Sequence, residues 1–457
     1  MNTDDMRAEE RNQRLLDIKA MLEDKNYEAF DENFLDLHPY DQGLLFEGLS
    51  SYQRKAVYYL LTPKEMAELF DIMEEDNEYL EVYFSEMESE YAADLLNEMY
   101  VDNAVDVLDQ LDEAVQENLF DHMDNEDSTH FQLMLTYGED TAGSIMTTEF
   151  IAFEENLTLA ETTKQLRELV KEAESIYYLY VVDENDHLQG VVSMRDLLLN
   201  NESVYLHDLM NTDIRYIDVD TDQEDAAHIV REYNFLALPV VDHDRRLIGV
   251  ITVDDIVDVI DDEASEDYSG LAGVDVEDLS DSPVKASQTR LPWLMALLVL
   301  GLGTSTLISA FEGMLAEAAI LAAFISLITG TAGNAGTQSL AVAVRRLSNV
   351  SDRDLKGMQL FVRELFTGLI TGFIMGIFAF LIIWLWQQNI FLGIVVGAAL
   401  AVAVLISTLA GTYIPILIDK MGFDPAVASG PFITTLTDLT SVVIYFSIAQ
   451  VFLPYLV

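Results

Sequence analysis

Five long apolar stretches fill the chain from Leu291 to its end. Each is long enough to cross the roughly 30 Å hydrocarbon core of a bilayer as an α-helix. Because lipid offers no partners to backbone N–H and C=O groups, such segments must form helices that satisfy their own hydrogen bonds. The chain is therefore predicted to end in a five-helix transmembrane domain, residues 291–457. Its spans cover about 291–311, 318–340, 360–387, 391–418 and 426–453.

The last span contains one carboxylate, Asp438, and no Lys, Arg or His follows Lys420. A charged side chain at mid-membrane costs roughly 2.5–3.5 kcal/mol on insertion scales, so it normally faces a partner, a cavity or an ion. One interpretation is a protonated Asp438 bonded to Thr435, Thr437 or Thr440. The other, which we predict, is a cation site lining a pore.

The second span is rich in small and polar residues between Thr329 and Ser339, and it includes Asn334 and three glycines. Glycines permit either close helix packing or an unwound turn with free carbonyls. Both alternatives stay open, and with Asp438 this stretch is predicted to form the pore wall. Arg363 and Glu364, at the start of the third span, are expected to snorkel or to pair rather than to carry ions.

Charge is divided unevenly along the chain. Only seven of its 24 basic and eight of its 80 acidic residues lie at or after Arg290, so the N-terminal part carries nearly all of the net charge of −56. Such an acidic body repels nucleic acid and attracts cations. The absence of cysteine excludes disulfides and thiolate metal sites. The first residues lack the features of a cleaved signal peptide.

Basic residues between the apolar spans set the expected orientation. They lie at Arg290, at Lys420 and in the loop that holds Arg345, Arg353 and Lys356. The positive-inside rule then places the N-terminus in the cytoplasm and the C-terminus outside. We expect a multi-pass protein of the cell inner or plasma membrane.

Residues 1–137 show apolar residues at helical spacing and are predicted to form an acidic helical domain that stacks into a superhelix. Helix starts are marked by Thr62, Pro63 and Glu65, which together make a capping box with proline at the first helical position. His38 and Pro39 mark the start of an earlier helix in the same way.

Residues 138–263 contain one motif twice, at a constant offset of 59 residues, with copies within 138–203 and 204–263. Each copy is an apolar strand, an Asp-rich turn, a second strand with glycine, and a helix. The pair resembles tandem cystathionine-β-synthase (CBS) domains. In that family a Ser or Thr and an Asp contact a ribose, which falls here on Ser193 with Asp196 and on Thr252 with Asp255. Helix capping by these hydroxyls is the equally weighted alternative.

Carboxylates recur at helical spacing from Asp254 to Asp267, and Asp102 and Asp106 lie one turn apart in the helical domain. Such a run of carboxylates usually forms the solvated face of a helix. The density of carboxylates here favours pairs that share hard cations instead. Oxygen ligands without cysteine favour Mg²⁺ or Ca²⁺ over Zn²⁺. Residues 264–290 follow as a connecting helix.

The whole order of domains, with the stretches Gly333–Ser339 and Asp424–Asp438, resembles the MgtE family of bacterial magnesium channels. The resemblance implies a homodimer, a pore in which Asp438 holds hydrated Mg²⁺, and a connecting plug helix that closes the pore when cytoplasmic Mg²⁺ occupies the soluble domains. Two positions depart from the family pattern. Asn234 stands where relatives carry an acid, and Thr337 stands where some members carry an amide in the second span. The implied regulatory acids are Asp102, Asp106, Asp222, Glu224, Asp255, Asp258, Glu263, Glu266 and Asp267. The implied ATP contacts are Tyr178, Arg195, Asp196 and Phe235.

The prediction is therefore a Mg²⁺-gated magnesium transporter and not an enzyme. A CBS-regulated transporter of Co²⁺ or Mn²⁺ and a membrane-anchored nucleotide sensor are the alternatives. An intramembrane metalloprotease is excluded because its His-Glu-x-x-His motif needs histidine in a span, and none follows His243. An acidic pore also opposes an anion channel.

Overall fold

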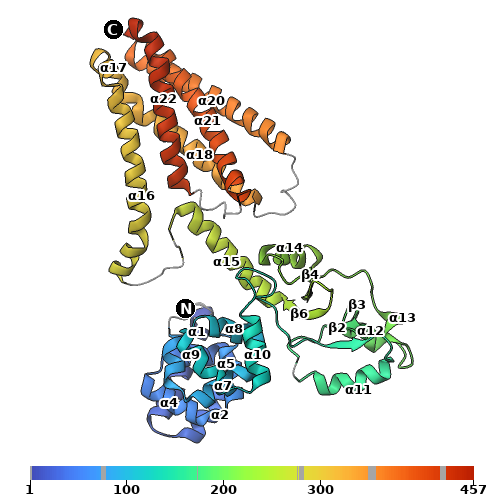
Figure 1. Ribbon diagram of the computed structural model, residues 1–457. Coiled ribbons are helices and arrows are strands. Elements are labelled where there is room, and N and C mark those ends of the chain that lie inside the picture. The colour runs from blue at the N-terminus through green and yellow to red at the C-terminus, as the bar shows by residue number, and fades with distance from the viewer. Residues whose placement is uncertain are drawn as a thin grey trace. The chain divides into compact units, whose positions relative to one another are not determined.

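A computed structural model describes residues 3–73, 79–171, 173–274, 276, 282–347, 357–421 and 429–456. The chain divides into two compact units, Met1–Val257 and Asp258–Val457. Helices alone make up the start of the first unit, two small sheets follow, and long helices make up most of the second unit (Figure 1). The multidomain class predicted from the sequence is confirmed.

The N-terminal part of the first unit is a stack of short helices. Thr62 caps one of them: its hydroxyl accepts from the Glu65 N–H, and the Glu65 carboxylate accepts from the Thr62 N–H at 2.9 Å. The predicted capping box and the predicted start at Pro39 are both confirmed. The helices are α1 Thr3–Glu23, α2 Tyr27–Leu35, α3 Pro39–Glu47, α4 Ser51–Leu60, α5 Pro63–Phe70, α6 Leu80–Glu86, α7 Ser89–Glu98, α8 Val101–Asp109, α9 Glu113–Phe120 and α10 Asn125–Met134.

The duplicated motif forms two three-stranded sheets of the same topology, β1-β2-β3 and β4-β5-β6. In the first, Val181 pairs with Gly190; in the second, Val240 pairs with Gly249, which keeps the offset of 59 residues. The predicted hairpins are confirmed. The elements are β1 Ala152–Glu154, α11 Leu159–Leu169, β2 Tyr178–Val182, β3 Leu188–Ser193, α12 Met194–Leu199, α13 Leu206–Leu209, β4 Ile217–Asp218, α14 Gln223–Tyr233, β5 Ala237–Val241 and β6 Leu247–Thr252.

Helix α15 runs without a break from Val253 to Ala272, beginning directly after β6. It therefore passes through the predicted domain boundary at 263/264. Helix α16, Pro283–Ala310, likewise joins the end of the predicted connecting segment 264–290 to the first apolar span. The predicted connecting helix is thus divided between α15 and α16, and residues 275 and 277–281 lie outside the described residues.

Five helices of the described chain are long and apolar enough to cross a membrane, as predicted. The second unit's remaining elements are α17 Glu312–Glu317, the 3₁₀ helix η1 Ala319–Phe324, α18 Ile325–Leu347, α20 Gly357–Gln387, α21 Ile390–Asp419 and α22 Gly430–Leu456. Arg353 and Lys356 of the predicted basic loop, and Asp424, lie outside the described residues.

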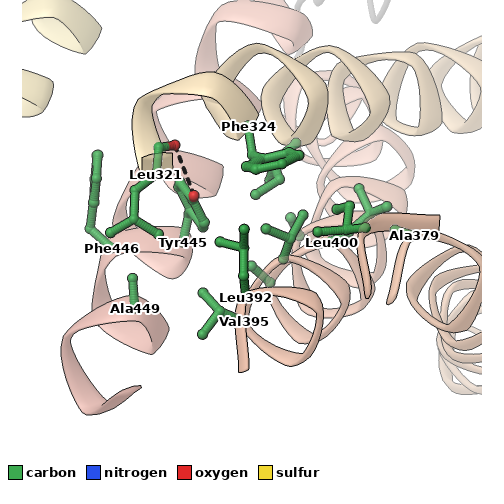
Figure 2. Packing of buried hydrophobic residues seen from close by; sticks show 14 of the residues in the cluster. Leu321, Phe324, Ala379, Leu392, Val395, Leu400, Tyr445, Phe446 and Ala449 are labelled. Carbon is green, nitrogen blue, oxygen red and sulfur yellow. Dashed lines mark hydrogen bonds between the residues drawn. The ribbon is translucent and has the colours of Figure 1, made fainter. Parts of the chain in front are cut away.

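The core of the second unit is apolar and lies among η1, α18, α20, α21 and α22. Figure 2 shows Leu321 next to Tyr445, with Phe324 and Phe446 in the same core. The hydroxyl of Tyr445 donates to the carbonyl of Leu321 at 2.9 Å, which satisfies a polar group that would otherwise be buried alone. This bond fixes the C-terminal half of α22 to the start of the second span.

Close glycine contacts bring the membrane helices together. A Cβ on Gly376 would lie 2.6 Å from the Gly397 carbonyl oxygen, so α20 and α21 touch through their backbones. In α18 the helix continues through Thr329–Ser339 without an unwound turn. Of the two alternatives for this stretch, the structure shows close packing.

Candidate functional site

Asp438 lies in α22, eight residues after that helix begins at Gly430. Its Oδ1 is buried and has no hydrogen-bond partner among the described residues. A buried carboxylate oxygen without a donor costs free energy, more than a neutral group in the same position. Asp438 therefore has the property expected of a group that receives a ligand from outside the chain.

The threonines beside Asp438 do not bond to it. Thr435 donates to the Pro431 carbonyl at 2.8 Å, and Thr437 donates to the Thr434 carbonyl at 2.9 Å. Thr440 donates to backbone carbonyls of its own helix as well. The alternative in which these hydroxyls hold a protonated Asp438 is not what the structure contains.

Helices α18 and α22 touch through the glycines of the second span. A Cβ on Gly333 would lie 2.9 Å from Thr434, and one on Gly336 would lie 3.0 Å from Ile433. Asn334, between these glycines, is exposed. An exposed amide inside an apolar span needs water or another protein chain as its neighbour. Glu364, by contrast, is paired with Arg346 at 3.4 Å, in line with the pairing expected for it.

A second group of carboxylates lies in the first unit. Oxygen atoms of Asp102 on α8, Glu174 and Asp255 on α15 all lie within 4.8 Å of one another. Asp102 is only 5% exposed. Two unit charges about 4 Å apart repel by about 4 kcal/mol at an effective dielectric constant of 20. Three ionised carboxylates in this space therefore need protons or a cation.

The titration of this cluster reflects that repulsion. Burial raises the pKa of Asp102 well above its ordinary value, and the charges of Asp255 and Glu174 raise it further. Burial also raises the pKa of Glu174 to about 7, assisted by the charge of Asp255. One oxygen of Glu174 is buried without a partner among the described residues. A proton or a cation would relieve the repulsion among these three carboxylates.

The sequence predicted Asp102 and Asp255 as ligands but not Glu174. Glu174 follows α11 and precedes β2, outside both acidic runs, and its N–H donates to the Glu149 carbonyl at 3.0 Å. Nothing in its local pattern marks it as a ligand. Only the fold brings it beside Asp102 and Asp255.

The group of three carboxylates found among the described residues does not include the other predicted regulatory acids. Asp106 lies one turn after Asp102 and lines a small cavity with Phe70 and Asn103. Asp222 caps α14, where its side chain accepts from the Glu224 N–H at 2.9 Å. The remaining four lie further along α15: Asp258, Glu263, Glu266 and Asp267.

The predicted nucleotide residues belong to the two sheets and their following helices. Tyr178 pairs with Ser193 across β2 and β3. Ser193 forms a capping box with Asp196, and its hydroxyl also donates to Asp196 Oδ2 at 2.6 Å. Arg195 is exposed in the first turn of the same helix. Phe235 lies in the second CBS copy, stacked on Tyr233 with ring centroids 5.4 Å apart.

Thr252 occupies the place in the second copy that Ser193 has in the first. Its hydroxyl lies 2.6 Å from Asp255 Oδ2, and its N–H donates to the same oxygen at 3.0 Å. The Ser193 hydroxyl therefore makes the capping contact that the sequence offered as its alternative use, and Thr252 donates to the acid three residues later in the same way as Ser193. In the second copy, the acid of that pair is also a member of the carboxylate cluster.

Comparisons with known proteins cover nearly all of the chain. A family model described as a divalent cation transporter matches residues 325–448, one described as the MgtE intracellular N domain matches 37–140, and the CBS domain model matches 142–201 and 206–262. "Magnesium transporter MgtE" of Enterococcus faecalis is 51% identical over 436 residues, which are 95% of this chain and 96% of that protein.

Two solved structures each resemble slightly more than half of this chain. A crystal structure of the soluble part of a magnesium transporter has a TM-score of 0.54 and 42% identity, covering 56% of this chain and 99% of the other. The cytosolic domain of the Mg²⁺ channel MgtE in complex with ATP has a TM-score of 0.50 and 32% identity, with 54% and 99% covered.

Proposed function

This chain belongs to the MgtE family of magnesium transporters, and we propose that it conducts Mg²⁺ past Asp438 under the control of cations bound to its acidic part. The observation that carries the proposal is the buried Asp438 oxygen that lacks a donor in an apolar helix. Mg²⁺ gives up its waters reluctantly, so a carboxylate can hold the hydrated ion without a complete protein cage.

The pore is proposed to form between two copies of the chain. Asn334 and Gln338 are exposed on α18 although they lie in an apolar span. A homodimer would give these amides and Asp438 a shared aqueous path instead of lipid. The N-terminus is proposed to lie in the cytoplasm and the C-terminus outside, following the basic residues.

Regulation is proposed to act at the cluster of Asp102, Glu174 and Asp255. A divalent cation there would relieve the repulsion among the three carboxylates and tie α8 to the start of α15. The further acids Asp106, Asp222, Glu224, Asp258, Glu263, Glu266 and Asp267 are proposed as additional regulatory ligands. Because a cation that binds one state shifts the equilibrium toward it, several such sites would close the pore as cytoplasmic Mg²⁺ rises.

Adenine nucleotide is proposed to bind the CBS pair. The support is the likeness to a cytosolic domain solved with ATP and the match of the CBS model. The proposed contacts are Tyr178, Ser193, Arg195, Asp196, Phe235 and Thr252. Nucleotide binding would require Ser193 and Thr252 to share their capping hydroxyls with a ribose.

Mg²⁺ flux into liposomes that contain the purified chain tests the proposal. Wild type is expected to conduct Mg²⁺ when Mg²⁺ on the cytoplasmic side is low, and Asp438→Ala is expected to lose that flux while eluting normally in size exclusion. Glu317→Gln, an acid variant outside the long spans, serves as the matched control and should conduct normally. Normal Mg²⁺ flux through Asp438→Ala would refute the assignment of Asp438.

A further inference from the structure

The end of α15 is anchored among the membrane helices by residues that no part of the proposed function uses. Gly273 follows α15 with a left-handed backbone (φ +68°), and its N–H donates to the Ser269 carbonyl at 2.8 Å. Val274 N–H reaches the same carbonyl at 3.2 Å, so this is a glycine helix cap. The helix therefore stops at a position that glycine alone fits without strain.

The indole of Trp293, from α16, lies directly over Gly273. A Cβ at Gly273 would be 2.7 Å from the indole Cδ1 and nearer still to Nε1, so no side chain fits between them. Trp293 Nε1 is buried and has no acceptor among the described residues. Contact between backbone and indole thus joins the end of α15 to the first span.

Leu271 joins the same end of α15 to three other spans. Its side chain packs in a cluster with Leu340 and Val344 of α18 and Ile433 of α22, next to Ile414 and Ile418 of α21. Its carbonyl oxygen lies 3.1 Å from the position of a Cβ on Gly430, the first residue of α22. Asp438 follows eight residues later, about 12 Å along the helix axis.

We propose that Trp293 and Gly273 form a latch that transmits movement of α15 to the helix that carries Asp438. This inference rests on the proposed function. Helix α15 is continuous from the residues beside Asp255 to Ala272, so a displacement at its start reaches its end. The latch holds the C-terminal end of α15 against α16, and Leu271 at the same end packs against Ile433 of α22. Trp293 is then a positioning residue for gating and not a ligand of the conducted ion.

The first test measures closure of the pore by Mg²⁺ in liposomes. Gly273→Ala is expected to raise the Mg²⁺ midpoint for closure about 5- to 30-fold, the change that corresponds to the cost of a Cβ in the left-handed conformation. Trp293→Ala is expected to act in the same direction. Both should conduct normally at low Mg²⁺. Gly301→Ala, on the same helix as Trp293 and with open space around its Cβ, is the matched control and should keep the wild-type midpoint.

The second test uses the fluorescence of Trp293. The chain has three tryptophans, and the other two, Trp384 and Trp386, are exposed on α20. In the double variant Trp384→Phe, Trp386→Phe, emission comes from Trp293 alone. We expect it to shift, and its quenching by acrylamide to change, as Mg²⁺ closes the pore. Adding Gly273→Ala should increase quenching at high Mg²⁺.

The outcomes separate the latch from the proposed function. If wild type conducts and closes with Mg²⁺ while Gly273→Ala and Trp293→Ala keep its midpoint and Trp293 emission is insensitive to Mg²⁺, the latch is refuted and the proposed function stands. If wild type never closes with Mg²⁺, the proposed regulation fails, and the latch fails with it.

Discussion

The carboxylates of Asp102 and Asp255 approach within 4.8 Å, although 153 positions of sequence separate them. One belongs to the helical domain and the other to the helix that leaves the CBS pair. Like charges so close would push these elements apart if both were ionised and no cation were present. Cation concentration should therefore control how firmly the two domains of the first unit hold together.

Glu174→Gln should weaken this control without abolishing transport. The amide keeps the size of the side chain but removes one negative ligand, so the Mg²⁺ midpoint for closure should rise by about tenfold, equivalent to about 1.4 kcal/mol. Flux at low Mg²⁺ should be unchanged. The measurement is Mg²⁺ flux into liposomes at graded cytoplasmic Mg²⁺, with Glu168→Gln on α11 as control. An unshifted midpoint would remove Glu174 from the site.

The stability of the metal-free protein should fall as pH rises from about 4.5 to about 7. The raised pKa of Glu174, about 7 against an ordinary value near 4.5, means that the folded state holds a proton that the unfolded state releases. Stability from this group is complete below the unfolded pKa and is lost as pH rises through the folded pKa, at up to about 1.4 kcal/mol per pH unit.

The midpoint of thermal unfolding measured across this pH range checks that sign. Glu174→Gln should flatten the slope, and saturating Mg²⁺ should flatten it in wild type because the cation replaces the proton. Part of the pH dependence of stability should remain in Glu174→Gln, because the pKa of Asp102 is also raised. A metal-free stability that increased between these pH values would contradict the assignment.

Nucleotide binding should depend on residues that the cation cluster does not use. Arg195→Ala and Tyr178→Ala are expected to weaken ATP binding in calorimetry of the full chain, since they remove a cation and a ring from the predicted pocket. Glu174→Gln should leave ATP affinity unchanged. Ser193→Ala should cost about 1 kcal/mol of stability through the lost cap whether or not ATP binds. If Arg195→Ala and Tyr178→Ala bind ATP with the affinity of wild type, the nucleotide does not bind at these residues.

Local sequence patterns predicted the elements of this fold well. The capping box at Thr62, the paired hairpins at an offset of 59 and the five spans each depend on residues that are close together in the sequence. The position of Asp438 in the last span could also be read locally, because any charge there is conspicuous.

Long-range contacts were the part that sequence patterns could not supply. Glu174 is one acid among many, and only the packing of α8 against the CBS pair places it beside Asp102. The acidic run of α15 pointed to many candidate ligands of equal standing, and only the fold shows that Asp255 lies beside Asp102 and Glu174. The carboxylates at helical spacing from Asp254 to Asp267 already crossed the predicted boundary at 263/264, and α15 is indeed continuous from Val253 to Ala272.

The most direct test of the account is the Mg²⁺ dependence of closure in the variant Asp102→Asn, Glu174→Gln, Asp255→Asn. These changes remove the ligands and also the repulsion, so they do not by themselves fix the resting state. The measurement is Mg²⁺ flux into liposomes, with protease resistance of the chain followed at the same Mg²⁺ concentrations. We predict that wild type becomes non-conducting and protease-resistant as Mg²⁺ rises, while the triple variant changes little. Closure of the triple variant at the wild-type midpoint would contradict this prediction.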